Sequence, residues 1–434
     1  NSNMTGEERK KKISDIKKGT PIATGTILKY QGTTQKFDVY RIPLECLVYN
    51  VENGRISSLV KSYTKEHSQL DPSNDDDAKK IEEFLFSSSE ERNKKTKEDL
   101  IANGQIEPGI ITADGVIVDG NRRASLLRAI YLSHPDQNVR DKCAYFNTRI
   151  LPEDADPKEI LRLETTYQMA ADSKVDYNPI EKYLHAKDMK EHGFSTQQIM
   201  EYMGFKSQSE VNNALEIMGL IDEYLENFGY DGIYTRMPKG FEDDLLKLNQ
   251  TIKQIEKGGN KFGWIPQDRI EEVITDLKAI SFDYIRLDEK GDFDFRAIAY
   301  TASGNILQHQ DTWDKFVEKY NDAQEDIKEE ESVDDVLSKA KSDKDSKHLL
   351  DNRDTKWRNN VRESLMDAFK ECNDIVESKK EVNKPAVLIN KAKNSIEAID
   401  KISLLNAPNR DTLIKTLQEI AASISDLTAK TFID

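Results

Sequence analysis

The stretch from Ile110 to Tyr131 places the tightest limit on how this chain can fold. Ile110-Ile111-Thr112 and Val116-Ile117-Val118 are short apolar runs on either side of Ala113-Asp114-Gly115, a pattern typical of a β-hairpin with an Asp-Gly turn. Apolar residues at helical spacing follow directly after Asp119-Gly120-Asn121-Arg122-Arg123. The sequence therefore predicts strand, short turn and helix in immediate succession, a topology in which the helix N-terminus can bind a phosphate.

Arg122 and Arg123 fall in the first turn of that predicted helix. A helix N-terminus carries about half a positive charge, so a cation there costs a few tenths of a kcal/mol. One interpretation is a bound anion, which Gly120 lets approach the backbone and which the guanidinium groups hold. The other is a pair of solvent-exposed arginines that form ion pairs with Asp119 or Asp114. These residues alone leave both interpretations open.

Landmarks between residues 103 and 181 resemble the ParB/sulfiredoxin-like superfamily. Asn103 to Pro108 is similar to the first ParB box, in which Gly-Gln-x-x-Pro leads into a strand, and Gly120 to Arg123 is similar to the Gly-Glu-Arg-Arg box. Glu164-Thr165 resembles the Glu-Asn box, and Asn178 to Glu181 resembles the start of the next ParB helix. The resemblance implies a ParB-like nucleotide-binding domain followed by a ParB-type helix-turn-helix.

The resemblance also implies a ligand, a nucleoside triphosphate (CTP or ATP) that could bind with Mg²⁺. It assigns nucleotide binding to Gly104, Gln105, Pro108, Gly120, Asn121, Arg122, Arg123 and Thr165, and catalysis to Glu164. The chain departs from the family where Asn121 replaces an acidic residue, Ser125 replaces a third arginine and Thr165 replaces an asparagine that helps to hold a metal-bound triphosphate. We therefore expect phosphate binding to be retained and NTPase activity to be slow or absent. The scattered cysteines and histidines predict no metal site made by the protein itself.

A second candidate site lies in the helices predicted over residues 179–230. Ser195 begins a short helix that Gly204 ends, and Ser207 caps a second helix, as in a helix-turn-helix. The residues assigned to DNA binding are Lys206, Gln208, Asn212 and Asn213. Residues 195–220 hold one lysine against three glutamates, a local charge of −2, whereas a strong DNA-binding surface neutralises several phosphates. DNA binding and a helical bundle without DNA contact, or with a protein partner, both remain open.

Two apolar stripes mark the C-terminal region. Leu413, Leu417, Ile420, Ile424 and Leu427 recur at coiled-coil spacing, and Ile389, Ile396, Ile399 and Ile402 form a similar stripe upstream. Pro408 separates the two stripes, so we predict a helical hairpin. The seam, meaning the two apolar stripes of this hairpin, is covered either within the chain or by contact with a second copy in a homodimer or with a partner protein. Residues 357–434 are expected to fold as an autonomous unit that mediates association.

Length and composition set the wider limits. A chain of 434 residues is too long for one ordinary core, and the pattern predicts an α+β chain with a small mixed domain followed by a mainly helical remainder. The expected divisions are a flexible arm (1–20), the ParB/sulfiredoxin-like domain (21–170), the helix-turn-helix module (171–230), a mixed, mainly helical domain (231–320), a charged linker (321–356) and the C-terminal helical domain (357–434). The sequence shows no membrane-spanning run, and its three cysteines are far apart, so we expect a cytoplasmic protein.

The function expected from these features is that of a nucleotide-responsive, DNA-associated switch in DNA partition, modification or phage defence. The net charge of −16 excludes a protein that coats nucleic acid through bulk charge. Two alternatives stay open. One is an enzyme on the same fold, such as a nucleotide hydrolase, a kinase or a nuclease. The other is a protein-interaction subunit whose pocket has degenerated.

Overall fold

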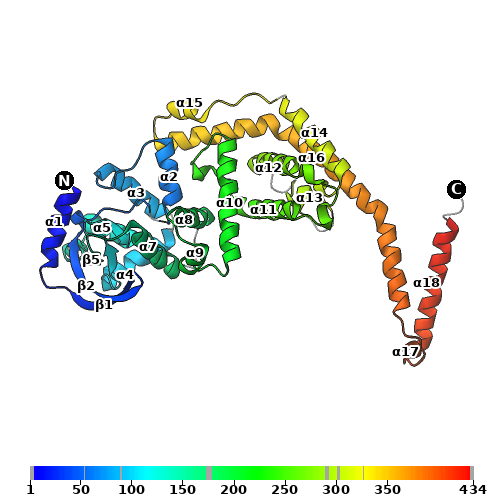
Figure 1. The fold of residues 1–434 in the computed structure, drawn as a ribbon, viewed down its shortest axis with the longest axis horizontal. Coiled ribbons are helices and arrows are strands. Elements are labelled where there is room, and N and C mark those ends of the chain that lie inside the picture. Colours follow the sequence, from blue (N-terminus) through cyan, green and yellow to red (C-terminus); the bar gives the residue numbers. More distant parts are fainter. Residues whose placement is uncertain are drawn as a thin grey trace.

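The computed structural model describes residues 4–52, 54–87, 90–172, 178–288, 293–300, 304–325 and 327–430. A small mixed β-sheet with its covering helices lies near the N-terminus, and a mainly helical remainder follows it (Figure 1). The predicted α+β class is confirmed. None of the helices within the described ranges carries an apolar stretch sufficient to cross a membrane.

The sheet has the strand order β1-β2-β5-β3-β4. The strands are β1 (Ala23–Tyr30), β2 (Thr33–Pro43), β3 (Gly109–Ile111), β4 (Ile117–Asp119) and β5 (Tyr145–Ile150). β3 lies parallel to β5, and the other neighbouring pairs are antiparallel. The predicted hairpin is confirmed as β3 and β4, with Gly115 in its turn at a φ of 88°. A Cβ atom at Gly115 would lie 2.1 Å from the Cys46 carbonyl oxygen, so the turn requires glycine.

Helices cover both faces of the sheet. The helices of this unit are α1 (Gly6–Lys17), α2 (Ser57–Glu66), α3 (Asp75–Ser87), α4 (Glu90–Asn103), α5 (Asn121–Ser133), α6 (Gln137–Lys142) and α7 (Pro157–Asp172), with the 3₁₀ helix η1 (Leu44–Cys46). Because successive strand residues point to opposite faces, Ile111 packs with residues of α1 to α5, whereas Ile110 packs with Leu163 of α7. The junction between β4 and α5 is therefore held by packing from both sides.

The N-terminal segment differs from the expected flexible arm. Thr5 and Glu8 form a capping box that begins α1. Ile13 of α1 is buried in the core of the sheet domain, and Arg9 donates a hydrogen bond of 2.9 Å to the Asp114 carbonyl oxygen. Two apolar side chains, Ile13 and the half-buried Ile16, and one arginine anchor this helix, a pattern too sparse to stand out in a lysine-rich sequence.

The helical remainder shares one hydrophobic core whose described members run from Met169 to Val376. Its α-helices are α8 (Pro179–Glu191), α9 (Thr196–Met203), α10 (Gln208–Asn227), α11 (Phe241–Lys257), α12 (Ile270–Leu287), α13 (Arg296–Ala299), α14 (Gln310–Glu325), α15 (Val333–Ser338), α16 (Asp343–Glu397), α17 (Lys401–Leu405) and α18 (Arg410–Lys430). Its 3₁₀ helices are η2 (Tyr234–Arg236), η3 (Asn260–Phe262), η4 (Gln267–Arg269) and η5 (Ile306–Gln308). The boundaries expected at residues 230, 320 and 356 therefore do not separate independent cores.

The expected linker at 321–356 is instead part of this body. α16 is 55 residues long and crosses the expected boundary at residue 356 without a break. Leu350 and Trp357 on this helix are buried, as are Val333 and Val336 of α15. The many charged residues of this segment, which led to the predicted linker, surround only a few buried apolar residues. The average composition of the segment therefore did not indicate a helix packed against the body.

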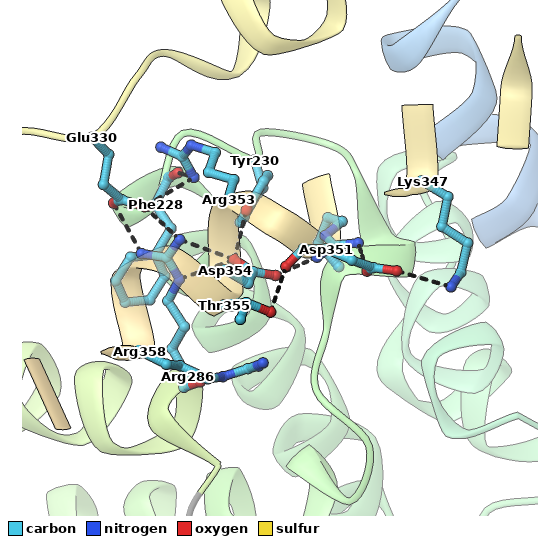
Figure 2. Close-up of polar contacts among 11 residues, drawn as sticks. Phe228, Tyr230, Arg286, Glu330, Lys347, Asp351, Arg353, Asp354, Thr355 and Arg358 are labelled. Carbon is cyan, nitrogen blue, oxygen red and sulfur yellow. Dashed lines mark hydrogen bonds and ion pairs between the residues drawn. The ribbon is translucent and has the colours of Figure 1, made fainter. Parts of the chain in front are cut away.

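A buried ionic cluster fixes α16 to the body (Figure 2). Asp354 of α16 accepts hydrogen bonds from Arg236, from Arg286 (2.9 Å) and from the Tyr230 hydroxyl (2.6 Å). Arg286 is also paired with Glu330 at 2.7 Å. Burial disfavours the charged form of Asp354, but the two arginines outweigh it and lower the pKa of the carboxyl. Both charges of the Asp354–Arg286 pair are thus buried and satisfied.

The C-terminal region differs most from its prediction. Beyond Val376, α16 leaves the body as an arm, and the chain turns back through α17 into α18 (Figure 1). The predicted reversal near Pro408 is confirmed. The seam does not close within the chain along its whole length, because Ile389, Ile402 and Leu427 are 64%, 70% and 67% exposed. Closure against a second copy or a partner protein stays a prediction. Residues 357–376 belong to the core of the body, so the expected autonomous unit from residue 357 is wrong.

Candidate functional site

The N-terminus of α5 carries no side-chain cap. Gly120 is the residue before the helix, with a φ of 117°, and makes no capping hydrogen bond. Its carbonyl oxygen accepts the first helical hydrogen bond, from the Ala124 amide at 2.9 Å. A Cβ atom here would lie 2.5 Å from Cζ of Phe146, so the position requires glycine. The first-turn amides and the positive end of the helix dipole are features that favour an anion.

Arginines gather around Asp119 at this corner. Arg123 forms an ion pair with Asp119 at 2.9 Å and also donates to the Glu107 carbonyl oxygen. Burial raises the pKa of Asp119, and the positive charges of Arg123, Arg55 and Arg149 oppose that rise. The Asp119 pairing expected in one of the two interpretations is therefore present for Arg123. Arg123, Arg55 and Arg149 thus all act on the single carboxylate of Asp119.

Gln105 holds the loop that precedes β3. Its Nε2 donates to the Asn147 carbonyl oxygen at 2.8 Å, and its Oε1 accepts from the Asn147 amide at 2.8 Å. Gly104, with a φ of 72°, follows the end of α4, and Pro108 is half-buried next to β3. These three predicted nucleotide-binding residues shape the loop whose Glu107 carbonyl oxygen contacts Arg123. Gln105 uses both ends of its amide within the fold.

Asn50 joins two of the predicted site residues. The Asn50 amide donates to Asn121 Oδ1 at 3.2 Å, and Asn121 Nδ2 donates to the Asn50 carbonyl oxygen at 3.0 Å. The Asn50 side chain donates to Glu164 Oε2 at 3.0 Å. The structure thus brings Asn121 and Glu164 together through a residue that the sequence did not indicate. No motif marks Asn50, because its role depends on contacts with distant parts of the chain.

Glu164 is buried at the end of this chain of contacts. Only 2% of the residue is exposed, and burial raises the pKa of its carboxyl to about 8, although the Asn50 and Gly54 N–H donors favour the charged form. Gly54 donates to Glu164 Oε1 at 3.2 Å. A substrate could reach the carboxyl of this predicted catalytic residue only if the loop around residues 50–54 moved.

Thr165 faces the interior. Its hydroxyl donates to the Leu161 carbonyl oxygen at 2.7 Å and lies 2.6 Å from Nε2 of His185. Burial lowers the pKa of His185 to about 4, so the imidazole is neutral near pH 7 and can donate from Nε2 to the hydroxyl. The hydroxyl of this predicted nucleotide-binding residue is thus buried and hydrogen-bonded within the fold.

A second buried carboxyl holds the other end of the same loop. Glu181 of α8 accepts hydrogen bonds from the Ser58 amide, at 3.0 Å, and from the Ser58 hydroxyl. Burial raises the pKa of Glu181 to about 7, against the effect of the Ser58 donors. We call residues 48–58 the bridging loop; it includes the first two residues of α2, and its residue 53 lies outside the described part. Its contacts join the start of α5 to α7 and α8, and no sequence pattern indicated this connection.

Glu164 predicts a specific dependence of stability on pH. Its pKa lies above the ordinary value in the folded protein, so the folded state binds more protons and stability falls as pH rises toward 8. His185 affects the pH dependence of stability only below about pH 6.5. There the unfolded state binds more protons than the folded state, so stability rises with pH. Between pH 6.5 and 8, denaturant titration should show that the wild type loses about 1–2 kcal/mol more unfolding free energy than Glu164→Gln.

The exposed Glu153 supplies a matched control for this experiment. Glu153→Gln makes the same chemical change at the surface and should track the wild type at each pH. If Glu164→Gln also tracks the wild type from pH 6.5 to 8, the assigned protonation of Glu164 is incorrect.

The helix-turn-helix shape is present in α9 and α10. Ser195 and Ser207 cap the two helices, and Gly204 lies between them at a φ of 75°. The predicted DNA-binding side chains are not equally available, because Gln208 donates to Gln197 at 2.7 Å and Asn213 accepts from Lys253 of α11. Lys206 and Asn212 are exposed.

No protein-family model matches the chain, and no curated protein matches it. Within the described ranges, no group of three or more His, Cys, Asp and Glu side chains is arranged to hold a metal ion. The helix N-terminus and the arginines at α5 are elements that suit an anion.

Proposed function

We propose that this chain binds a nucleotide through its phosphates at the start of α5 and responds to it through the bridging loop. The observation that carries the proposal is the uncapped helix N-terminus at Gly120 beside a cluster of arginines. Amide donors, the helix dipole and guanidinium groups are the elements that recognise phosphate in proteins. The order of strand, glycine turn and helix agrees with the resemblance to ParB-like domains.

Asn121 supplies the response to the ligand. It lies directly after Gly120 and holds the bridging loop through two hydrogen bonds to Asn50. The same loop contacts α7 through Glu164 and α8 through Glu181, and α8 packs against α10. A phosphate that shifts the first turn of α5 would therefore move contacts that lead to the helix-turn-helix. This series of contacts supports a ligand-responsive switch. It supports a hydrolase less, because the carboxyl of Glu164 is buried.

The test is a thermal-shift panel of ATP, ADP, CTP, GTP and UTP, each with and without Mg²⁺. At least one nucleotide should raise the melting temperature, because a ligand that binds only the folded state stabilises it. Phosphate release from that nucleotide should be slow or absent. Rapid release that Glu164→Gln abolishes would favour the enzyme alternative, and no shift with any nucleotide would favour an interaction subunit.

We also propose that DNA association, the second part of this function, is weak and sensitive to salt. Lys206, the one cation among the predicted DNA-binding residues, is exposed just before α10, and the chain as a whole has a net charge of −16. Fluorescence anisotropy with random duplex DNA should give a dissociation constant above about 10 µM at physiological salt. Lys206→Ala should reduce the slope of log affinity against log salt by about 1, because one phosphate contact is lost.

Lys94 on α4 provides the control for the DNA measurement, since it is exposed and far from α10 in the chain. Lys94→Ala should bind DNA like the wild type. Tight binding to random duplex at physiological salt, or equal salt slopes for wild type and Lys206→Ala, would show that the DNA contacts lie elsewhere.

A further inference from the structure

Residues 382–430 form an arm whose apolar side chains are exposed. The exposed fractions are 77% for Val382, 64% for Ile389, 70% for Ile402, 57% for Ile424 and 67% for Leu427. Contiguous apolar surface of this kind on a protein marks an interaction site. The arm lies outside the core of the body, so the folding of the body does not explain why these positions are apolar.

The arm covers its own stripes only in part, because Leu413 and Leu417 are half-buried whereas Ile420, Ile424 and Leu427 are exposed. α18 returns from the tip at α17 but diverges from α16 (Figure 1). The stripe on α18 continues at heptad spacing along a helix of 21 residues, which is about 30 Å long. The exposed parts of the stripes on α16 and α18 can be buried if further helices pack against them and complete a bundle.

A groove lies where the arm leaves the body. It has a volume of about 690 Å³, and Ile375 and Val382 of α16 line it together with His309 and Lys315. Val382 is therefore both part of the groove and the first exposed apolar residue of the arm. At the other end of the arm, the tip exposes Ile402 and Leu405, which are 70% and 49% exposed. Charged side chains, among them Glu371 and Lys379, also line the groove, but most of its surface is apolar and is therefore complementary to an apolar tip.

Charge favours a second copy over a polyanion. Residues 382–430 contain seven Lys and Arg against five Asp and Glu, a net charge of +2. Because the whole chain has a net charge of −16, the residues outside the arm carry −18. With so little net charge, the arm as a whole attracts nucleic acid or acidic lipid only weakly. Between copies, the strongly acidic bodies repel each other, and they lie farthest apart when the arms run in opposite directions.

We propose that two copies of this chain associate through antiparallel arms, with the tip of each arm in the groove at the base of the other. In this register Val382 lies opposite Ile402 of the second copy, and Ile389 lies opposite its Ile396. The stripes on the two copies of α16 and α18 then meet in a four-helix bundle. This association of two copies does not require a nucleotide, so its test is independent of the test of the proposed site at α5.

Light scattering of the intact protein at about 10 and 50 µM tests the association. The expected mass is about 99 kDa, twice the chain mass of 49.6 kDa. Ile420→Glu with Ile424→Glu should give a monomer with an unchanged melting temperature, because both residues lie outside the core of the body. Gln418→Glu with Ser425→Glu is the matched control, since it adds the same charge beside the stripe and should stay dimeric. A monomeric wild type overturns the proposal.

Cross-linking tests the register. The native cysteines are all buried, so cysteines introduced on the arm react selectively. A mixture of Val382→Cys and Ile402→Cys proteins should form a disulfide between the two variants, and neither variant alone should cross-link. Cross-linking of each variant with itself would indicate parallel arms and would overturn the antiparallel arrangement.

Discussion

Replacing Asp354 with alanine is expected to lower the free energy of unfolding by about 3–5 kcal/mol, the usual cost of removing one partner from a buried ion pair. Asp354 is 6% exposed, and Arg286, which it neutralises, is 1% exposed. The guanidinium of Arg286 packs against the rings of Trp357 and Phe228, with its centre 4.4 and 4.6 Å from the ring centroids. Without Asp354, the buried guanidinium of Arg286 still pairs with Glu330 but loses the other of these two carboxylate partners (Figure 2).

Asp351 is the matched control for Asp354. It lies one turn earlier on α16 and binds Arg236 at 2.8 Å and Lys347 at 3.1 Å, but its side chain is 46% exposed. Asp351→Ala should cost less than about 1 kcal/mol, because exposed ion pairs contribute little. Denaturant titrations of the two variants give the comparison. A loss below about 1 kcal/mol for Asp354→Ala would mean that the cluster does not fix α16 to the body.

Removing the arginines at the start of α5 should weaken nucleotide binding strongly. A charge-assisted hydrogen bond to phosphate contributes about 1.5–3 kcal/mol, so Arg122→Ala and Arg123→Ala should each raise the dissociation constant about 10- to 150-fold. The fold should persist in Arg123→Ala, since Arg55 and Arg149 remain to balance Asp119. Calorimetric titration of each variant with the nucleotide that stabilises the wild type measures the effect.

Arg128 lies on the same helix but further from its N-terminus, where it pairs with Glu82 at 3.2 Å. Arg128→Ala makes the same charge change about 9 Å along the helix from residue 122 and should bind nucleotide within about twofold of the wild type. Equal losses for Arg128→Ala and the other two variants would indicate a general charge effect and not a phosphate site.

Local sequence patterns predicted the parts of the fold that depend on neighbouring residues. The hairpin at 110–118, the helix after Gly120 and the caps at Asn178 and Ser195 are all present, because turn and cap chemistry acts over a few residues. The bridging loop could not be predicted. Asn50 meets Glu164 across 114 positions in the sequence, and such a contact leaves no local pattern.

The C-terminal prediction failed for a different physical reason. The apolar spacing from Leu350 to Val376 and that from Ile389 to Leu427 are alike in sequence, yet the first is buried in the body and the second is exposed. Periodicity shows which face of a helix is apolar but not what covers that face. The boundary expected at residue 357 therefore fell inside a helix that belongs mostly to the body.

Hydrogen exchange of the intact protein with and without nucleotide tests the central claim most directly. With a saturating nucleotide, exchange should slow in peptides covering residues 117–126 and in those from the bridging loop, because the ligand engages the amides of the first turn of α5 and Asn121 holds Asn50. Peptides from α18 should exchange as before. Unchanged exchange over residues 117–126 with every nucleotide tested, or protection confined to another part of the chain, would contradict a phosphate site at the start of α5.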